Sequence, residues 1–164
     1  MSTGDDELAG GCACGAVRYR LASQPIWVHC CHCTACQRET GSGFAVNALI
    51  EADRVALIAG RPVPIMTPSE SGRGQRIWRC PACEVALWSN YGGNGAIHFV
   101  RAGTLDRPGR IVPDIHIYTA SKLPWVAIPD GTRAVPRFYD YRSTWPAEAW
   151  ARREAALQRH ARPV

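Results

Sequence analysis

Residues 26–43 read IWVHCCHCTACQRETGSG and contain four of the eight cysteines of this chain. The β-prone start of this run predicts a short strand that leads directly into the cysteines. The stretch from Thr34 to Thr40 favours one or two turns of helix, which Gly41 and Gly43 would end in a turn. The run therefore predicts a strand, a group of thiols and a short helix in immediate succession.

Further short strands are expected on both sides of this run, because β-prone segments there are bounded by Gly, Pro, Asp or Asn. They cover residues 16–21, 26–28, 44–50, 55–58, 75–79, 86–90, 96–102 and 111–118. A helix is predicted near the C-terminus, where Pro146 suits a first turn and Trp150, Ala151 and Leu157 fall near one face. The expected fold class is mainly β, built of short antiparallel strands, with a C-terminal helix.

Length and composition limit the remaining possibilities. The chain has 164 residues, of which 46% are hydrophobic and 20% charged, so a single globular domain is expected. We divide it into a flexible acidic leader (1–10), a metal-binding domain (11–142) and a C-terminal helical segment (143–164). No charge-free run reaches the ~20 apolar residues that a membrane span needs. The start of the chain resembles neither a secretory nor a transit signal, so the cytoplasm is the expected location.

The net charge of +5 comes from an excess of arginine that is dispersed along the chain. A nucleic-acid interface usually concentrates its basic residues on one face, so no nucleic-acid partner is expected. Such an excess of positive charge would mildly favour the binding of an anionic small molecule.

The cysteines carry most of the functional information. Without an export signal thiols stay reduced, so the close spacings favour metal sites over a disulfide framework. In an extended strand Cys12 and Cys14 would point to the same side, and Cys80 and Cys83 would add two thiolates from a tight turn. Four thiolates form the closed tetrahedral site typical of structural zinc. The alternative is that one pair is merely buried cysteine.

In an extended strand Cys31 and Cys33 would also share one side, and Cys36 would return to them after a turn, so these three thiols form a second group. By the same alternation His32 should point away from this group, and Cys30 should face the other way and receives no role. Three protein ligands would leave zinc one open position, as in catalytic sites, for water or an incoming thiolate. Two alternatives remain open. His29, His32 or a distant side chain could close the site, or the three thiols could bind no metal.

These motifs resemble a known family. The segments GGCACGAVRY (10–19), CCHCTACQRETGSGFAVN (30–47), WRCPACEVALW (78–88) and HIYTASKLPWVAI (116–128) are similar to the glutathione-dependent formaldehyde-activating enzyme family, also called the centromere protein V family. The resemblance extends from about Gly11 to Phe138. It implies a zinc-stapled β-tent fold, with Cys12, Cys14, Cys80 and Cys83 as structural zinc ligands and Cys31, Cys33 and Cys36 around a more labile zinc. Glu84 departs from the family, which usually has glycine there, and implies either a strained turn or a changed one.

The resemblance also implies a function. It indicates a carbon–sulfur lyase-type enzyme that condenses glutathione with formaldehyde to S-hydroxymethylglutathione, or acts on a related thiol adduct, with Cys31, Cys33 and Cys36 as catalytic residues. A non-catalytic carrier of glutathione or another thiol is one alternative. A zinc-ribbon interaction module is another, favoured by the exposed-looking aromatic residues Trp27, Trp125 and Tyr139.

Smaller candidates lie near these motifs. Residues 41–44 could line a thiol pocket or could simply form a turn. His116, in a strand-like segment, is expected to be structural. Arg38 and Lys122 could contact substrate carboxylates, although solvated surface is the simpler expectation for both.

Overall fold

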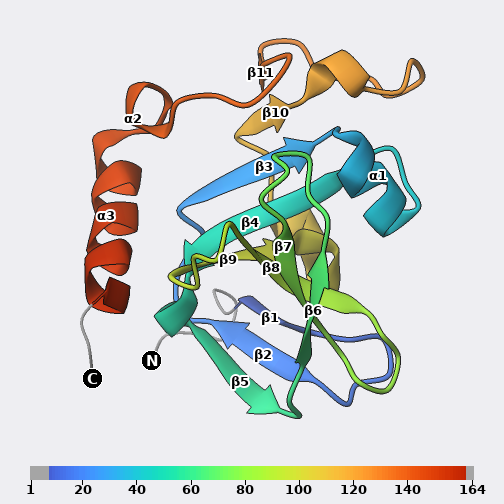
Figure 1. Cartoon of the computed structure of the whole chain (residues 1–164), viewed down its shortest axis with the longest axis vertical. Coiled ribbons are helices and arrows are strands. Elements are labelled where there is room, and N and C mark those ends of the chain that lie inside the picture. The colour runs from blue at the N-terminus through green and yellow to red at the C-terminus, as the bar shows by residue number, and fades with distance from the viewer. Residues whose placement is uncertain (1–7, 162–164) are drawn as a thin grey trace.

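The computed structural model describes residues 8–161, and the chain is mainly β with one long helix at its C-terminal end (Figure 1). The strands are β1 (Leu8–Gly11), β2 (Arg18–Leu21), β3 (Trp27–Cys31), β4 (Ala45–Glu51), β5 (Val55–Ala59), β6 (Val63–Thr67), β7 (Gln75–Arg79), β8 (Ala86–Tyr91), β9 (Ile97–Arg101), β10 (Ile115–Ile117) and β11 (Arg133–Ala134). The α-helices are α1 (Thr34–Thr40), α2 (Tyr141–Thr144) and α3 (Ala147–Ala161). Single 3-10 turns lie at Ala52–Arg54, Ala102–Thr104, Pro108–Arg110 and Thr119–Ser121. The predicted fold class is confirmed.

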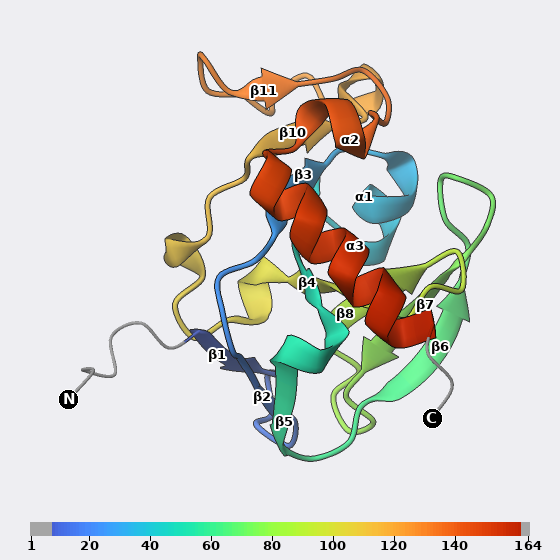
Figure 2. The same cartoon turned by 90° about the vertical axis from the view of Figure 1, so that its left-hand side faces the viewer.

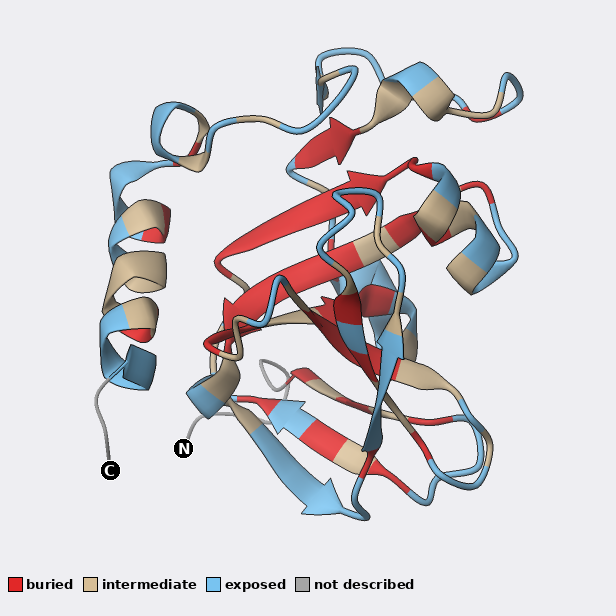
Figure 3. Cartoon of the chain, in the orientation of Figure 1, coloured by how far each residue is buried: buried red, intermediate tan, exposed pale blue. Residues whose placement is uncertain are grey.

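The described strands form two sheets. A three-stranded sheet has the order β1-β2-β5, and an eight-stranded sheet has the order β11-β10-β3-β4-β9-β8-β7-β6. Most pairs are antiparallel, but β10 runs parallel to both β3 and β11, so the large sheet is mixed. Its centre, β3 and β4, is almost wholly buried, whereas its edge strand β6 and the edge strand β5 of the small sheet are largely exposed (Figure 3). The centre of the sheet is therefore where a water-shielded site can be built.

The N-terminal boundary differs from the prediction. Residues 1–7 of the predicted leader lie outside the described residues, but residues 8–10 belong to β1. Leu8 is buried and opposes Leu21 on β2, so apolar burial holds this segment in the fold. Gly10 is required at its position, because an added Cβ would lie 2.6 Å from the carbonyl oxygen of Thr104. Strands β6 and β11 were not predicted, since β6 carries a proline and an exposed apolar face.

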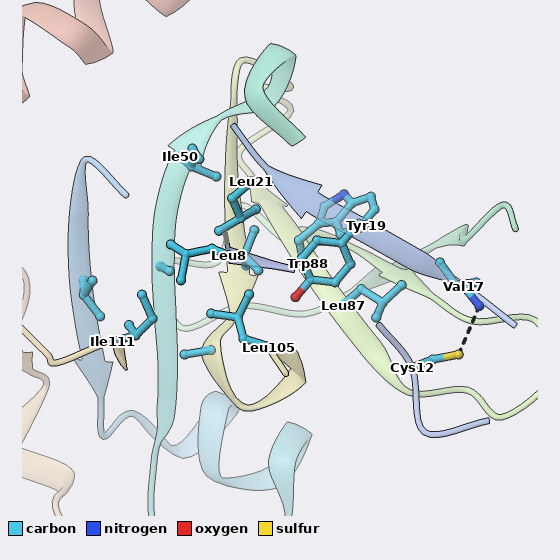
Figure 4. Close-up of a cluster of buried hydrophobic side chains, with 14 of the residues drawn as sticks. Leu8, Cys12, Val17, Tyr19, Leu21, Ile50, Leu87, Trp88, Leu105 and Ile111 are labelled. Carbon is cyan, nitrogen blue, oxygen red and sulfur yellow. Dashed lines mark hydrogen bonds between the residues drawn. The ribbon is translucent and has the colours of Figure 1, made fainter. Parts of the chain in front are cut away.

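One core fills the space between the two sheets (Figure 4). Tyr19 of β2 meets Trp88 of β8 edge to face, with ring centroids 5.7 Å apart. Leu87 of β8 and Leu105, in the loop after β9, are buried in the same core. This core positions the turns that carry Cys12 and Cys80.

A second core lies between the large sheet and α3, which crosses in front of β4 in Figure 2. Trp27 packs on Trp145 with ring centroids 6.0 Å apart. Ala149 and Ala156 of α3 are buried in the same core, so the face of the helix with small residues packs toward the sheet. Trp27 is therefore buried, and the expectation that it is exposed was wrong. In the part of the chain that the structure describes, every helix is too short or too polar to cross a bilayer.

Candidate functional site

The first cysteine cluster joins two turns that are distant in sequence. Cys12 and Cys14 follow β1, and Cys80 and Cys83 lie between β7 and β8. Their four Sγ atoms lie within 4.8 Å of one another, with 3.5 Å between Cys12 and Cys14 and 3.8 Å between Cys14 and Cys80. The predicted grouping is observed, but its reasoning was wrong in one respect. Cys12 and Cys14 lie beyond the end of the strand, and a turn rather than strand alternation brings their sulfurs together.

Backbone groups stabilise negative charge on these sulfurs. The N–H of Val17 donates to Cys12 Sγ at 3.2 Å, and the N–H of Ala82 donates to Cys80 Sγ at 3.4 Å. Burial raises the pKa of the Cys12 thiol, but the hydrogen bonds from Val17 and from the neighbouring thiols outweigh it and bring the pKa to about 6. Thiolate is the form that binds metal, and four such donors suit tetrahedral zinc.

Glu84 follows this cluster and has a φ of 60°, the left-handed region in which glycine is favoured. The sequence left two outcomes open, a strained turn or a changed one. The structure has the strained turn, because a non-glycine residue occupies a position that favours glycine. The Glu84 carbonyl accepts a hydrogen bond of 3.0 Å from Arg79 Nη1, which helps hold the turn.

The second cluster lies at the junction of β3 and α1. Cys31 is the last residue of β3, Cys33 is the N-cap of α1, and Cys36 lies in the first turn of that helix. Their Sγ atoms also lie within 4.8 Å of one another, and all three residues are buried. Cys33 lies outside the strand, so the sequence argument from alternation does not apply to it. Its sulfur instead caps the helix by accepting the N–H of Cys36 at 3.3 Å.

The three thiols share their protons unequally. Hydrogen bonds from Cys31 and Cys36 lower the pKa of Cys33 to about 3, and the hydrogen bond to Cys33 is the largest of the effects that raise the pKa of Cys31. Without a metal, one thiolate flanked by two thiols is therefore the favoured state of the cysteine trio (Cys31, Cys33 and Cys36). A divalent cation would convert all three into anionic donors.

The trio lines a cavity of about 270 Å³ between the large sheet and the segments that follow β6 and β10. The remaining lining residues are His29, Ala35, Asn47, Ser69, Glu70, Ser71, Arg73, Gln75, Tyr91, Phe99, Ile117, Tyr118, Phe138 and Tyr141. Aromatic rings make up much of the wall, and Glu70, Ser71 and Arg73 form an exposed polar rim. The cavity is large enough for a small molecule whose sulfur reaches the cysteines.

Neither neighbouring histidine joins the trio. His29 faces the cavity, but its Nε2 is hydrogen-bonded to the hydroxyl of Tyr139 at 2.6 Å, and that hydroxyl accepts a hydrogen bond of 2.7 Å from Trp145 Nε1. Burial lowers the pKa of His29 to about 3, so the ring is neutral. His32 lies just past the end of β3 and groups with Cys30 and His116, away from the trio.

A buried guanidinium lies close to the trio. Arg101, at the end of β9, donates through Nη1 to Asn47 Oδ1, while its Nε and Nη2 are buried without a hydrogen-bond partner among the described atoms. The hydrogen bond with Cys31 lowers the pKa of Cys36, but the hydrogen bond with Cys33 and burial outweigh it, and the Arg101 charge only partly opposes the resulting rise. A buried cation with free N–H groups requires anions nearby. Three metal-binding thiolates would supply them, so this environment fits a metal at Cys31, Cys33 and Cys36.

Several residues of this site were missed from sequence, because they belong to strands and loops far from the cysteine motifs. They are Asn47, Tyr91, Arg101 and the rim residues 69–73. Conversely, residues 41–44 do not line the cavity: Phe44 packs on His32 instead. Lys122 donates to the carbonyls of Leu123 and Val126, and Arg38 is exposed.

Fold and site together define a mainly β protein with two converging sets of cysteines, one of them in a cavity. The family model described as "Glutathione-dependent formaldehyde-activating enzyme" matches residues 7–121, well over half of the chain. The chain belongs to this family, as the resemblance of its motifs indicated.

Two individual proteins are also similar. A protein of Halomonas elongata, described as "Putative glutathione-dependent formaldehyde-activating enzyme", is 34% identical over 86 residues, which cover 49% of this chain and 54% of that protein. The chain thus spans about half the length of this curated relative. A Rhodobacter sphaeroides protein of known crystal structure is 20% identical, with a TM-score of 0.47, over 64% of this chain and 97% of that one.

Proposed function

We propose that this protein is a zinc-dependent enzyme of the carbon–sulfur lyase type that condenses glutathione with formaldehyde to S-hydroxymethylglutathione. The observation that carries the proposal is the convergence of three buried cysteine sulfurs in a cavity open to a small molecule. Membership of a family named for this activity supports it. The eight free cysteines are consistent with a reducing compartment, for which we propose the cytoplasm.

In this proposal the chain holds two zinc ions with different roles. Cys12, Cys14, Cys80 and Cys83 bind a structural ion, since four protein sulfurs complete a tetrahedral shell. Cys31, Cys33 and Cys36 would hold the second ion, and an outside thiol could join these three donors. When bound there, zinc would supply Lewis acidity and lower the pKa of an incoming thiol.

The residues of the chain would orient the reactants. The reaction adds the sulfur of glutathione to the carbonyl carbon of formaldehyde: a C–S bond forms, the C=O π bond breaks, and the thiol proton ends on the new hydroxyl oxygen. Arg73 at the rim can attract a glutathione carboxylate, and Glu70 can attract its ammonium group. The aromatic wall would exclude water from the sulfur.

The activity can be tested by NMR exchange spectroscopy of glutathione and formaldehyde, because these reactants also combine without a catalyst. The wild-type protein should accelerate exchange above the uncatalysed rate, and Cys33→Ser should abolish that increment. Arg76→Gln serves as a control, because Arg76 is exposed on β7 and does not line the cavity. An unchanged exchange rate with zinc-loaded wild-type protein would contradict the enzymatic proposal.

A thiol carrier is the second candidate, because the same cavity could bind glutathione without turnover. Isothermal titration calorimetry separates the two. Saturable binding that Cys33→Ser weakens, with no acceleration of exchange, would select the carrier. Neither proposal includes a nucleic-acid partner.

A further inference from the structure

A third group of metal-type side chains lies on the opposite face of β3 from the cavity. Strand alternation sends Cys31 toward the cavity and turns Cys30 away from it. Strand β10 runs parallel beside β3, with His116 as the register partner of Cys30. His32, just past the end of β3, reaches the same place. A cysteine and two histidines from two segments 84 residues apart therefore meet in one spot.

The three donor atoms are close and shielded. Cys30 Sγ lies 3.6 Å from His32 Nε2, and His32 Nε2 lies 2.8 Å from His116 Nδ1. All three potential ligand atoms fall within 4.8 Å of one another, and all three residues are buried. In tetrahedral zinc sites, donor atoms are about 3.3 to 3.8 Å apart. The sulfur–nitrogen distance already falls in this range, while the two imidazoles need to separate by about half an ångström.

The cluster is incompletely satisfied by hydrogen bonds alone. His32 Nε2 is the only atom through which that ring meets Cys30 and His116, and its Nδ1 is buried without a hydrogen-bond partner among the described atoms. Only one proton can lie between the two ring nitrogens, so His32 Nε2 and His116 Nδ1 cannot both be donors in this contact. A cation among the three atoms would satisfy the facing lone pairs at once.

We propose that Cys30, His32 and His116 form a third metal site that takes a divalent ion of the zinc class. One thiolate and two neutral imidazoles are donors that zinc and cobalt both accept. The site is chemically distinct from the two all-cysteine groups, because only one of its donors is sulfur. It shares no donor atom with them.

The charge of Lys122 gives the proposal a directional test. Lys122 acts electrostatically on His32, and its ammonium group donates to two backbone carbonyls, those of Leu123 and Val126, at 3.1 and 2.7 Å. A divalent ion with one thiolate leaves a net charge of +1, which this ammonium opposes. Removing the Lys122 charge should therefore tighten metal binding at this site, whereas a purely hydrogen-bonded cluster would gain nothing.

Native mass spectrometry of the full chain after saturation with Zn²⁺ tests the proposal. The wild type should carry three ions, Cys30→Ser and His116→Asn should each carry two, and His98→Asn should keep three, because His98 belongs to no such cluster. Circular dichroism establishes that each variant is folded. Two variants at the site ensure that the failure of one to fold leaves the other informative.

Cobalt substitution identifies the donor set independently of the count. The ion lost in Cys30→Ser should contribute the thiolate-to-cobalt absorption of a single sulfur, about a third of that lost in a variant without the Cys31, Cys33 and Cys36 ion. Lys122→Met should bind the third ion several-fold more tightly than the wild type. Two ions in the wild type, with no ion lost in Cys30→Ser or His116→Asn, would overturn the proposal.

Discussion

Arg152 Nη2 lies 2.7 Å from Glu51 Oε2, and Arg152 Nε lies 2.9 Å from the other carboxylate oxygen. This two-point contact joins the middle of α3 to the last residue of β4. The Glu51 side chain is only 2% exposed, so its carboxylate is buried against the guanidinium of Arg152. The C-terminal helix is therefore an integral part of the fold that supports the cavity.

Glu51→Gln should reduce the free energy of unfolding by about 2 kcal/mol, because it removes a charge-assisted hydrogen-bond pair and leaves Arg152 without its partner. Burial raises the pKa of Glu51, but the bonds from Arg152 outweigh it and the net pKa is below the usual value. The contribution is therefore present above the ordinary glutamate pKa of about 4.3 and is lost as the pH falls through the lower folded-state value.

Urea titration at pH 7 and pH 3 checks this prediction. Wild type and Glu51→Gln should differ at pH 7 and converge at the lower pH. Asp53→Asn, which removes the exposed pair with Arg159, should have a much smaller effect. Equal stability of wild type and Glu51→Gln at pH 7 would contradict the assignment.

Acid should destabilise the fold through His29. The pKa of this buried imidazole is about 3 in the folded chain, against about 6.5 for an unfolded histidine. Because the folded value is depressed, the stability is complete above the unfolded pKa and is lost progressively as the pH falls toward about 3. His29→Gln should flatten the pH dependence of unfolding between pH ~6.5 and ~4, measured by thermal melts. An unchanged slope in this range would argue against a neutral buried ring.

Glu84→Gly should stabilise the protein by about 1 kcal/mol, because glycine adopts positive φ without the penalty of a Cβ. Glu84→Ala keeps the Cβ and should give little of this gain. Denaturant unfolding of the three proteins decides between the two effects. A loss of stability in Glu84→Gly would show that the side chain contributes more than its backbone strain costs.

Arg101→Gln should weaken zinc at Cys31, Cys33 and Cys36 by about tenfold to a hundredfold, since it removes the buried positive charge near these thiolates. Zinc at the four-cysteine cluster should be unaffected. Competition with a chromogenic chelator measures both affinities. Equal weakening at the two clusters would point to a general loss of structure, and no weakening at either would contradict the electrostatic role.

Mild chelation should remove the ion of the trio before that of the four-cysteine cluster, because three protein donors leave one side accessible and four enclose the metal. The trio's ion should leave with little change in circular dichroism. Cys80→Ser should lower the melting temperature markedly, whereas Cys33→Ser should lower it much less. Simultaneous release of both ions with unfolding would contradict this difference.

The sequence by itself determined the local elements and the membership of the two cysteine groups. Strand β7 and helix α1 were predicted with their observed bounds, because their residue patterns and flanking glycines act over a few residues. The close cysteine spacings predicted which sulfurs lie together within one turn, whereas the meeting of the Cys12 and Cys14 turn with the Cys80 and Cys83 turn also required the packing of the two sheets.

Only the tertiary structure decided what surrounds those sulfurs. The placement of Arg101 and Asn47 beside the trio depends on the register of β4 with β9, and the meeting of Cys30 with His116 depends on the parallel pairing of β3 with β10. The same is true of Leu8, which was predicted to lie in a leader but is buried in a strand. Such pairings are long-range: they are selected by the burial of whole faces against one another, which no short stretch of sequence encodes.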